Sequence, residues 1–318
     1  MFDTIKQIFD NEHFTSEPHQ LYDPIEYTLH LGGKRIRPFL LMTANRMFGG
    51  EDSQVRNAAI GIEVFHNFTL LHDDLMDKSP IRRGQPTVYR KWDENTAVLS
   101  GDTMFALAWR YFLAQPSPRL QEILYCFNQT AIEVCEGQQY DMNFEQSDQV
   151  SIDDYMMMIR LKTAVLLAGA LKIGALYAGA PEADIEHLYQ FGIHLGLAFQ
   201  LADDLLDVYA DEAVFGKAVG GDIKDNKKTF LYLKALELAD ETQREQLRTL
   251  FATTPEDEKG KFLQVKAIFD AVDVRKATVE AIASYTERCI DDINCIHTEE
   301  EKKAFVLSLV HSLQSRNK

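Results

Sequence analysis

The sequence of 318 residues is poor in cysteine and in positive charge, and it lacks the alternating pattern of β-strands. Its four cysteines have no Cys-x-x-Cys spacing. This excludes the usual zinc motifs and a disulfide framework, and it favours a reducing compartment, with the cytoplasm as the expected location. Lysine and arginine number 33 against 49 aspartate and glutamate residues, for a net charge of −16. Nucleic acid is therefore not an expected partner, because phosphate backbones are bound by clustered basic residues.

Long uncharged hydrophobic runs are also missing. The first six residues carry charges within any apolar run and do not form a secretory signal. The most apolar stretch, residues 163–180, contains Lys172, and a lysine is costly in the middle of a bilayer. We therefore expect a buried helix there and no stable membrane insertion.

Helical periodicity dominates what is present. Glycine and proline breaks separate segments of roughly 12 to 28 residues, and no break is long enough to be an interdomain linker. The tail from Phe262 to Ser315 is expected to form two or three further helices. A hydrophobic content of 46% is ample for a packed core. The sequence thus predicts an all-α fold with residues 1–318 in a single domain.

Two acidic segments, residues 73–77 and 203–207, share the pattern Asp-Asp-x-x-Asp within apolar surroundings. Carboxylates four residues apart lie one helical turn from each other and can share a cation. Two bare carboxylates about 4 Å apart repel by roughly 4 kcal/mol at an effective dielectric of 20, so solvent or a metal must neutralise them. Alone, such a turn is more often a solvated surface, but a pair of them flanked by Leu, Phe and Ala indicates a site.

Oxygen ligands without nearby cysteine favour Mg²⁺, which takes one or two carboxylates and completes its shell with water and substrate phosphate. The sequence therefore predicts metal ligands at Asp73, Asp77, Asp203 and Asp207. The implied substrate is a phosphate or diphosphate.

The first basic segment is Leu-Gly-Gly-Lys-Arg-Ile-Arg-Pro at residues 31–38. Its two glycines end one helix and its proline opens the next, so the elbow between them holds three cations, including Lys34 and Arg37. A helix start beside cations is typical of an anion site. A basic helix cap is the alternative.

Further basic residues surround the first acidic segment. His66 lies seven residues before Asp73 on nearly the same helical face, and Arg82 and Arg83 follow directly. Guanidinium groups bind phosphate oxygens in two places, so these residues are candidates for phosphate contact. A satisfied core histidine and a surface basic pair are the alternatives.

The second acidic segment has its own polar neighbours. Lys162 and Thr163 begin the apolar helix, Gln200 shares the acidic face, and a glycine-rich loop with Lys217 and Lys227 follows. A lysine among apolar residues is costly unless it faces an anion, and the loop at residues 216–229 is similar to a phosphate-covering lid. A plain solvated loop is the alternative. Residues 137–141 are expected to end or kink a helix, with Gln138 and Asp141 supporting a cleft wall.

In this order, these motifs resemble the trans-isoprenyl diphosphate synthases, the polyprenyl synthetase family, of the short-chain farnesyl or geranylgeranyl diphosphate synthase type. The similarity covers about residues 21 to 235. It implies antiparallel helices around a deep central cavity, with the acidic motifs facing each other across its mouth, usually in a homodimer. The implied enzyme is a prenyltransferase that condenses isopentenyl diphosphate head to tail (1′-4) with dimethylallyl, geranyl or farnesyl diphosphate, releasing diphosphate and an all-trans prenyl diphosphate.

The resemblance also implies a role for each site residue. Asp73 and Asp77 would hold two Mg²⁺ ions and Asp203 a third, with Asp207 in support. Allylic diphosphate would contact Arg82, Lys162, Lys217 and Lys227. Isopentenyl diphosphate would lie in a separate pocket of Lys34, Arg37, His66 and Arg83. Thr163 and Gln200 offer oxygens to the carbocation, and closure of the 216–229 loop would exclude water.

Product length is predicted from the residues below the first acidic motif. A chain growing along this helix from Asp73 passes Thr69 and then Phe68, about 7.5 Å further down. In the family, an aromatic residue at this place goes with short products, which implies about fifteen to twenty carbons. Phe68 packed sideways into ordinary core is the alternative.

Three other functions stay open. A longer-chain polyprenyl diphosphate synthase would share all the motifs. A class I terpene cyclase would share the first, but its second metal site normally uses Asn, Ser or Thr and Glu, where this chain has aspartates. A non-catalytic synthase subunit should have lost one acidic motif, and this chain keeps both.

Overall fold

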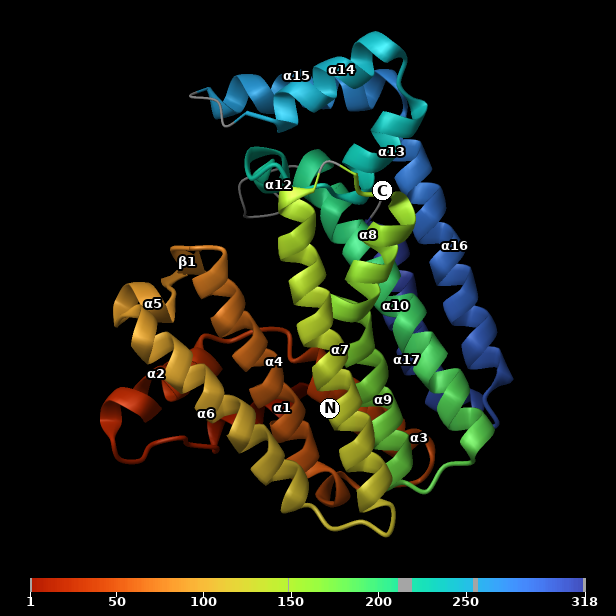
Figure 1. Ribbon diagram of the computed structural model, residues 1–318. Coiled ribbons are helices and arrows are strands. Elements are labelled where there is room, and N and C mark those ends of the chain that lie inside the picture. The colour runs from red at the N-terminus through yellow and green to blue at the C-terminus, as the bar shows by residue number, and fades with distance from the viewer. Residues whose placement is uncertain (1, 148, 211–218, 254–256, 317–318) are drawn as a thin grey trace. The chain divides into compact units, whose positions relative to one another are not determined.

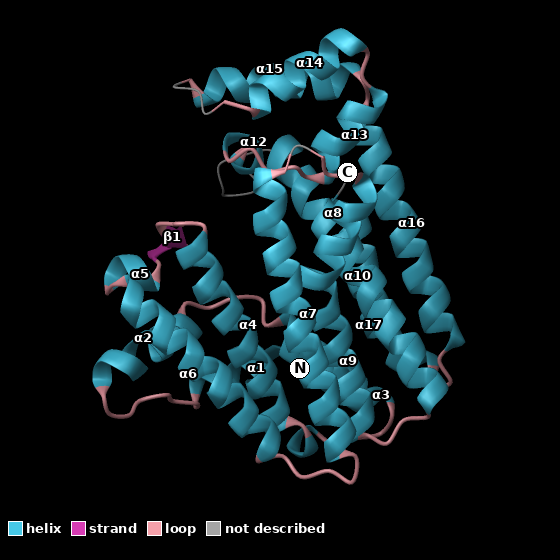
Figure 2. Cartoon of the chain, in the orientation of Figure 1, coloured by secondary structure: helices cyan, strands magenta, loops and turns pink. Residues whose placement is uncertain are grey.

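A computed structural model describes residues 2–147, 149–210, 219–253 and 257–316. In these ranges the regular secondary structure is helical apart from one hairpin of two-residue strands, β1 (Ile81–Arg82) and β2 (Gln85–Pro86), which pair antiparallel (Figure 2). The all-α prediction is therefore confirmed. Among the described helices, none is both long and apolar enough to cross a bilayer. The predicted apolar helix is α9 (Val165–Tyr177), whose side chains are mostly buried.

The helices form two compact units, one of residues 1–127 and 170–185, the other of residues 128–169 and 186–318. The single domain expected over residues 1–318 stays a prediction. The first unit contains α1 (Phe2–Asp10), α2 (His19–His30), α3 (Ile36–Met47), the 3₁₀ turn η1 (Asp52–Gln54), α4 (Arg56–Met76), α5 (Val88–Lys91) and α6 (Glu94–Leu113) (Figure 1).

The second unit contains most of the remaining helices. They are α8 (Ile152–Ile159), the π-helical turn η2 (Arg160–Ala164), α12 (Gly221–Lys224), α13 (Phe230–Leu238), α14 (Glu241–Phe251), α15 (Glu258–Ala271), α16 (Val274–Cys295) and α17 (Glu300–Arg316). Three helices contribute residues to both units, namely α7 (Leu120–Gln146), α9 and α10 (Glu182–Tyr209). The tail forms three helices, as expected.

Aromatic burial organises the first unit. Phe65 of α4 and Phe112 of α6 are fully buried, and both contact Phe127, at ring-centroid distances of 5.3 and 4.3 Å. Burying a Phe side chain stabilises the fold by about 1.5 to 3 kcal/mol. Helix α6 begins at Asp93, whose side chain accepts a hydrogen bond from the Thr96 amide at 2.8 Å. This packing fixes the helix that carries the first acidic motif.

Side-chain caps start three helices of the second unit, α8, α14 and α15. The predicted break at residues 147–151 ends at Ser151, which forms a capping box with Asp154 and opens α8. Asp240 caps α14 and Asp257 caps α15 in the same way, each through its carboxylate.

The break expected at Gly137 is wrong, because α7 runs without interruption from Leu120 to Gln146. A Cβ atom at Gly137 would lie 2.3 Å from the backbone nitrogen of Lys162. The glycine therefore marks a close approach of two backbones and not a helix end.

Close packing of α10 on the chain around Ala164 yields a stability prediction. A Cβ atom at Gly196 would lie 2.5 Å from the Ala164 Cα atom. We expect Gly196→Ala to lower the free energy of unfolding by about 1 to 3 kcal/mol, as overpacked cores do. Urea denaturation measures the change. Ala283→Gly, at an exposed position of α16, serves as control and should lose only helix propensity, about 1 kcal/mol. A Gly196→Ala variant more stable than the parent would contradict the close contact.

Candidate active site

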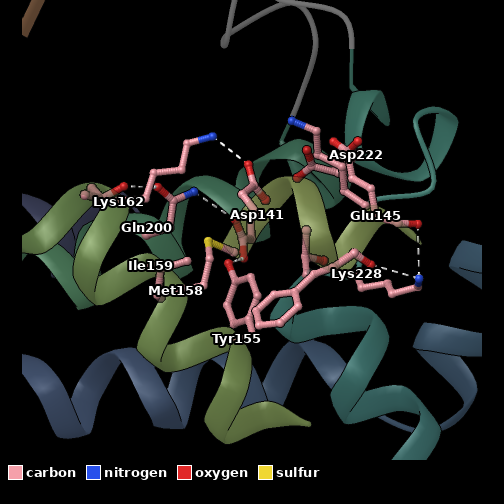
Figure 3. A pocket seen from close by; sticks show the side chains of 14 residues that line it. Asp141, Glu145, Tyr155, Met158, Ile159, Lys162, Gln200, Asp222 and Lys228 are labelled. Atoms are coloured by element: carbon pink, nitrogen blue, oxygen red, sulfur yellow. Dashed lines mark hydrogen bonds and ion pairs between the residues drawn. The ribbon is translucent and has the colours of Figure 1, made fainter. Parts of the chain in front are cut away.

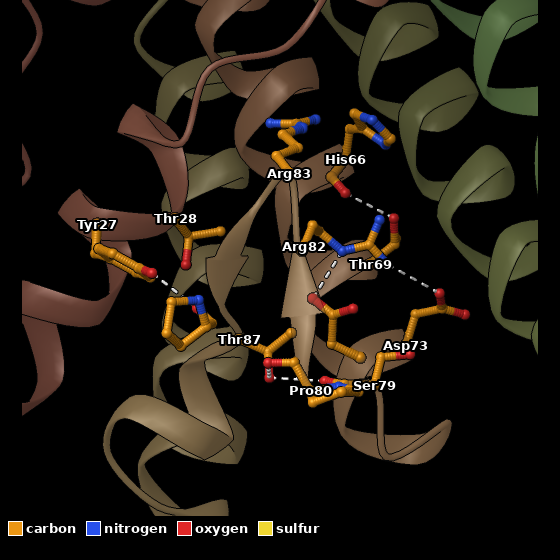
Figure 4. A network of polar contacts seen from close by, with 12 residues as sticks. Tyr27, Thr28, His66, Thr69, Asp73, Ser79, Pro80, Arg82, Arg83 and Thr87 are labelled. Carbon is orange, nitrogen blue, oxygen red and sulfur yellow. Dashed lines mark hydrogen bonds and ion pairs between the residues drawn. The ribbon is translucent and has the colours of Figure 1, made fainter. Parts of the chain in front are cut away.

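The first acidic motif ends α4, and its middle aspartate is buried. Asp74 is 5% exposed, and its Oδ2 accepts a hydrogen bond from Arg82 Nε at 2.7 Å (Figure 4). Burial raises the pKa of the Asp74 carboxyl, while Arg82 opposes this shift. Asp73 lies 3.5 Å from Arg82 Nη2, and Asp77 is the exposed C-cap of the helix. The two outer carboxylates therefore stay near solvent, and the middle one anchors the arginine.

The predicted basic pocket forms around His66 in the same unit. Arg37 Nη1 donates a hydrogen bond to His66 Nε2 at 3.0 Å, so the ring proton of the neutral imidazole lies on Nδ1. Burial, and then the charges of Arg37 and Arg83, hold the pKa of His66 well below its usual value. His66 is thus neutral at pH 7 and offers Nδ1–H as its remaining donor.

Glu63 is a buried carboxylate beside this pocket to which the sequence analysis gave no role. This carboxylate is 1% exposed, and its Oε1 accepts hydrogen bonds from Arg35 Nη1 at 2.7 Å and from Asn67 Nδ2 at 3.1 Å. Its charge also acts on Arg37, where it favours the protonated guanidinium. Glu63 lies three residues before His66 on α4, and that spacing was the only available signal.

The other two predicted cations flank this pocket. Arg83 follows β1 and donates a hydrogen bond from Nη1 to the Gly32 carbonyl, which brings the glycine elbow and the Arg-Arg segment together. Gly33 has a φ of +132°, which L side chains rarely adopt, and a Cβ atom there would lie 2.8 Å from Arg83 Cζ, so glycine is favoured at this position. Lys34 is exposed in the same elbow.

Phe68 joins an aromatic cluster below the acidic motif. Its ring centroid lies 5.5 Å from those of Phe65 and Phe105 and 4.8 Å from that of His72. The side chain keeps partial exposure, unlike Phe65, which is fully buried. Thr69 donates a hydrogen bond to the His66 carbonyl at 2.7 Å.

The second acidic motif borders a pocket of about 100 Å³ in the second unit (Figure 3). Polar side chains from α7, α8, α10 and the segment after α12 line it, and Met158 and Ile159 supply its apolar wall. The sequence-predicted residues among the lining are Asp141, Lys162, Thr163, Gln200 and Lys227. Residues up to 88 positions apart in the chain, from Asp141 to Thr229, thus meet in one cavity.

A π-helical turn presents Lys162 and Thr163 to this pocket. Such turns are rare and occur frequently at functional sites. Lys162 Nζ lies 2.6 Å from Asp141 Oδ2, with both side chains partly buried (Figure 3). Asp141 therefore supplies the charge that makes the half-buried lysine tolerable.

Asp204, the middle aspartate of the second motif, is 3% exposed and anchors a hydrogen-bond chain. Its carboxylate accepts from the Tyr155 hydroxyl and from Gln200 Nε2, the latter at 3.1 Å. Thr163 Oγ1 in turn donates to Gln200 Oε1 at 3.2 Å. Burial raises the pKa of Asp204 to about 6. These hydrogen bonds fix the orientation of the Gln200 amide and place its oxygen beside Thr163. The oxygens of Thr163 and Gln200 are the two that were predicted to face the carbocation.

The outer carboxylates of this motif again differ from the middle one. Asp203 is exposed, whereas Asp207 is half-buried and accepts hydrogen bonds from the backbone amides of Gly221 and Asp222 at 3.2 and 3.0 Å. Asp207 therefore holds the segment that leads to Lys227. Its predicted part in supporting a metal ion stays a prediction.

Two lysines follow this segment, and the structure separates their environments. Lys228 Nζ donates to the Phe144 and Ser147 carbonyls at the end of α7, the first at 3.0 Å, and so ties the loop to that helix (Figure 3). Lys227 lines the pocket. Lys217 and residues 211–218 of the predicted lid lie outside the described residues.

The acidic motifs offer a donor set that fits Mg²⁺. Each motif presents oxygen ligands in pairs, without sulfur, and the first pair lies at the solvent-facing end of α4. Within the described ranges, the group of three converging metal-type ligands is His13, Glu26 and His30, which belongs to neither motif. Paired carboxylates suit Mg²⁺, because this ion is usually held by one or two carboxylates together with water and substrate phosphates.

Comparison with known proteins agrees with this chemistry. The family model described as polyprenyl synthetase matches residues 18–269. The chain is 38% identical to a short chain isoprenyl diphosphate synthase of Methanothermobacter thermautotrophicus, over 82% of this chain and 80% of that one. It is 41% identical to a geranylgeranyl diphosphate synthase of Methanosarcina mazei, over 70% and 69% of the two chains. A crystal structure of geranylgeranyl pyrophosphate synthase matches with a TM-score of 0.94 and 43% identity, covering 100% and 99%.

The neutral His66 predicts how stability depends on pH. Its folded-state pKa lies well below 6.5, so the unfolded chain binds a proton that the folded chain does not as pH falls through the unfolded value of about 6.5. The free energy of unfolding should therefore fall below that pH, by at most about 1.4 kcal/mol per pH unit from this group. As the pH is lowered from 7.5 to 5, the midpoint of urea unfolding should fall less steeply for His66→Gln than for the parent protein. His19→Gln, at an exposed site, is the matched control; a slope unchanged in both variants would contradict the assignment.

Proposed function

Because the chain belongs to the polyprenyl synthetase family and is a prenyltransferase of the short-chain type, we propose that it condenses isopentenyl diphosphate head to tail with an allylic diphosphate. The allylic C–O bond would ionise, the isopentenyl double bond would attack the carbocation, and the released diphosphate would take the final proton. The products are diphosphate and an all-trans prenyl diphosphate one five-carbon unit longer.

One repeated arrangement carries the proposal. In both acidic motifs the middle aspartate is buried and hydrogen-bonded, at 5% exposure for Asp74 and 3% for Asp204. The aspartate before it lies nearer to solvent in each motif, with a cation from Arg82 beside one and the Lys162 pocket beside the other. In this arrangement the outer carboxylates can bind a metal ion, and the neighbouring basic side chains can bind a phosphate group.

Members of the family use divalent metal ions to bind diphosphate. We assign Asp73 and Asp77 to two Mg²⁺ ions and Asp203 to a third, with Asp207 holding the adjoining segment. When bound, these ions would stabilise the negative charge of the departing diphosphate. The chain's own contribution to that charge comes from the cations assigned to the allylic diphosphate, which are Arg82, Lys162, Lys217 and Lys227.

Isopentenyl diphosphate is assigned to the basic pocket of the first unit. Its ligands are Lys34, Arg37, His66 and Arg83. The His66 Nδ1–H would donate to a phosphate oxygen while Arg37 holds the ring through Nε2. In the second unit, the oxygens of Thr163 and Gln200 lie 3.2 Å apart and would face the carbocation.

The proposal also covers organisation and location. We assign residues 1–318 to one domain and the protein to a homodimer. Exposed apolar side chains on α6 support the dimer, because Leu99 and Leu113 are 59% and 60% exposed. Four free thiols support a reducing compartment, the cytoplasm.

Incorporation of labelled isopentenyl diphosphate tests the function. With Mg²⁺ and dimethylallyl, geranyl or farnesyl diphosphate as primer, we expect labelled prenyl diphosphate to form. Asp73→Asn and Asp203→Asn should each lower kcat by about a hundredfold or more, since each removes charge stabilisation in the transition state. Asp102→Asn, at an exposed position of α6, should leave kcat unchanged. A cyclic hydrocarbon made without isopentenyl diphosphate would identify a cyclase instead, and no incorporation with any primer would end the proposal.

Phe68 is proposed as the floor that limits the product to about fifteen to twenty carbons. Because its ring is partly exposed and packs on Phe105 at 5.5 Å, Phe68→Ala should open space and lengthen the product by at least one five-carbon unit. Chromatography of the dephosphorylated products measures this. Phe105→Ala is the matched control for loosening of the cluster. Equal lengthening in both variants, or none in Phe68→Ala, would remove Phe68 as the floor.

A further inference from the structure

Lys261 is a buried charge that the proposed reaction does not use. It lies on α15 and is 2% exposed, which is rare for lysine. Burial lowers the pKa of its ammonium group, and the Asp225 carboxylate opposes this shift. A buried ammonium group is tolerated only when polar partners satisfy it, so its partners indicate what it holds.

Those partners lie at the end of the segment that precedes Lys227. Lys261 Nζ donates to Asn226 Oδ1 and lies 3.4 Å from the Thr253 carbonyl oxygen. Its ammonium also lies 5.3 Å from the centroid of the Phe251 ring, a cation–π contact. Asn226 has a φ of +57°, in the left-handed region that side chains rarely adopt. Lys261 therefore holds Asn226, the left-handed residue that directly precedes Lys227 and Lys228.

Helix α15 contacts the segment from Gly220 to Asn226 at two further points. Glu258 pairs with Lys224 at 3.1 Å, and the Phe262 ring lies against Gly220, where a Cβ atom would come within 2.6 Å. On its other side the segment is held by Asp207 of α10. Figure 1 shows α14 and α15 at the same end of this unit as α12. The segment from Gly220 to Asn226 is thus clamped between α10 and α15.

We propose that Lys261 is a positioning residue for diphosphate binding: by holding Asn226 it sets where Lys227 stands in the pocket. This inference rests on the proposed function and extends it, because it gives α15 a part in the affinity for the allylic diphosphate. Lys261 does not itself line the pocket. Its effect reaches the substrate through Asn226, one residue from Lys227.

The test compares Michaelis constants for the two substrates. Lys261→Met keeps most of the stem and removes the ammonium, so Asn226 Oδ1 loses the Lys261 donor while the Asn226 amide nitrogen keeps its contact with the Thr253 carbonyl at 3.5 Å. Losing a charge-assisted hydrogen bond should raise KM for the allylic diphosphate by about ten- to hundredfold and leave KM for isopentenyl diphosphate unchanged. Lys266→Met, on the same helix and paired with Asp270 at 2.8 Å, should change neither. An equal rise in both constants, or no rise for the allylic substrate, would overturn the proposal.

Asn226→Gly supplies an independent variant that keeps the left-handed backbone free of strain. It removes the Oδ1 acceptor, so it should raise the allylic KM as Lys261→Met does, and the double variant should be no worse than either single one. If Lys261→Met does not fold, Asn226→Gly decides the matter: an unchanged allylic KM would overturn the proposal.

Hydrogen exchange separates this inference from the proposed function. Without substrate, amides of residues 219–229 should exchange faster in Lys261→Met than in the parent, while those of α4 should not change. If the parent enzyme incorporated no isopentenyl diphosphate, the proposed function would fail, yet faster exchange would still support the contact. Unchanged exchange in a protein that is active would overturn the role of Lys261 alone.

Discussion

The buried middle aspartate of each acidic motif is the constraint on which the site depends. Asp74 is tied to Arg82, and Asp204 to Tyr155 and Gln200, so each motif is anchored from inside the protein. A carboxylate removed from water must be hydrogen-bonded or paired. These bonds keep each helix turn in place and leave the first aspartate, Asp73 or Asp203, nearer to solvent.

Charge pairing also stabilises basic side chains in both units. In a chain of net charge −16, two of the partly buried cations are each paired with a carboxylate. Glu63 holds Arg35 at 2.7 Å, and Asp141 holds Lys162 at 2.6 Å. Each of these two cations is thus paired with a carboxylate of the chain itself. Removing a buried partner carboxylate is therefore expected to cost more than removing a surface charge, because an unpaired charge would remain.

The sequence pointed to the residues of the motifs, but it gave no role to the buried Glu63 and Lys261. Spacing identified the aspartates and their basic neighbours, because residues four apart share a helix face in any helix. The helical break expected at Gly137 was wrong, since a glycine that ends a helix and one that admits a neighbouring backbone look alike in sequence. Glu63 and Lys261 received no role because a charge in a helical segment reveals neither its burial nor its distant partner.

By itself, the sequence determined the all-α class, the acidic motifs, the basic elbow and the resemblance to a family that the comparisons confirm. These follow from local rules of periodicity and spacing. Tertiary structure alone decided which aspartate in each motif is buried, which of Lys227 and Lys228 is tied to helix carbonyls, and what Lys261 holds. Burial and partner choice arise from contacts between segments far apart in the chain, and no local pattern encodes them.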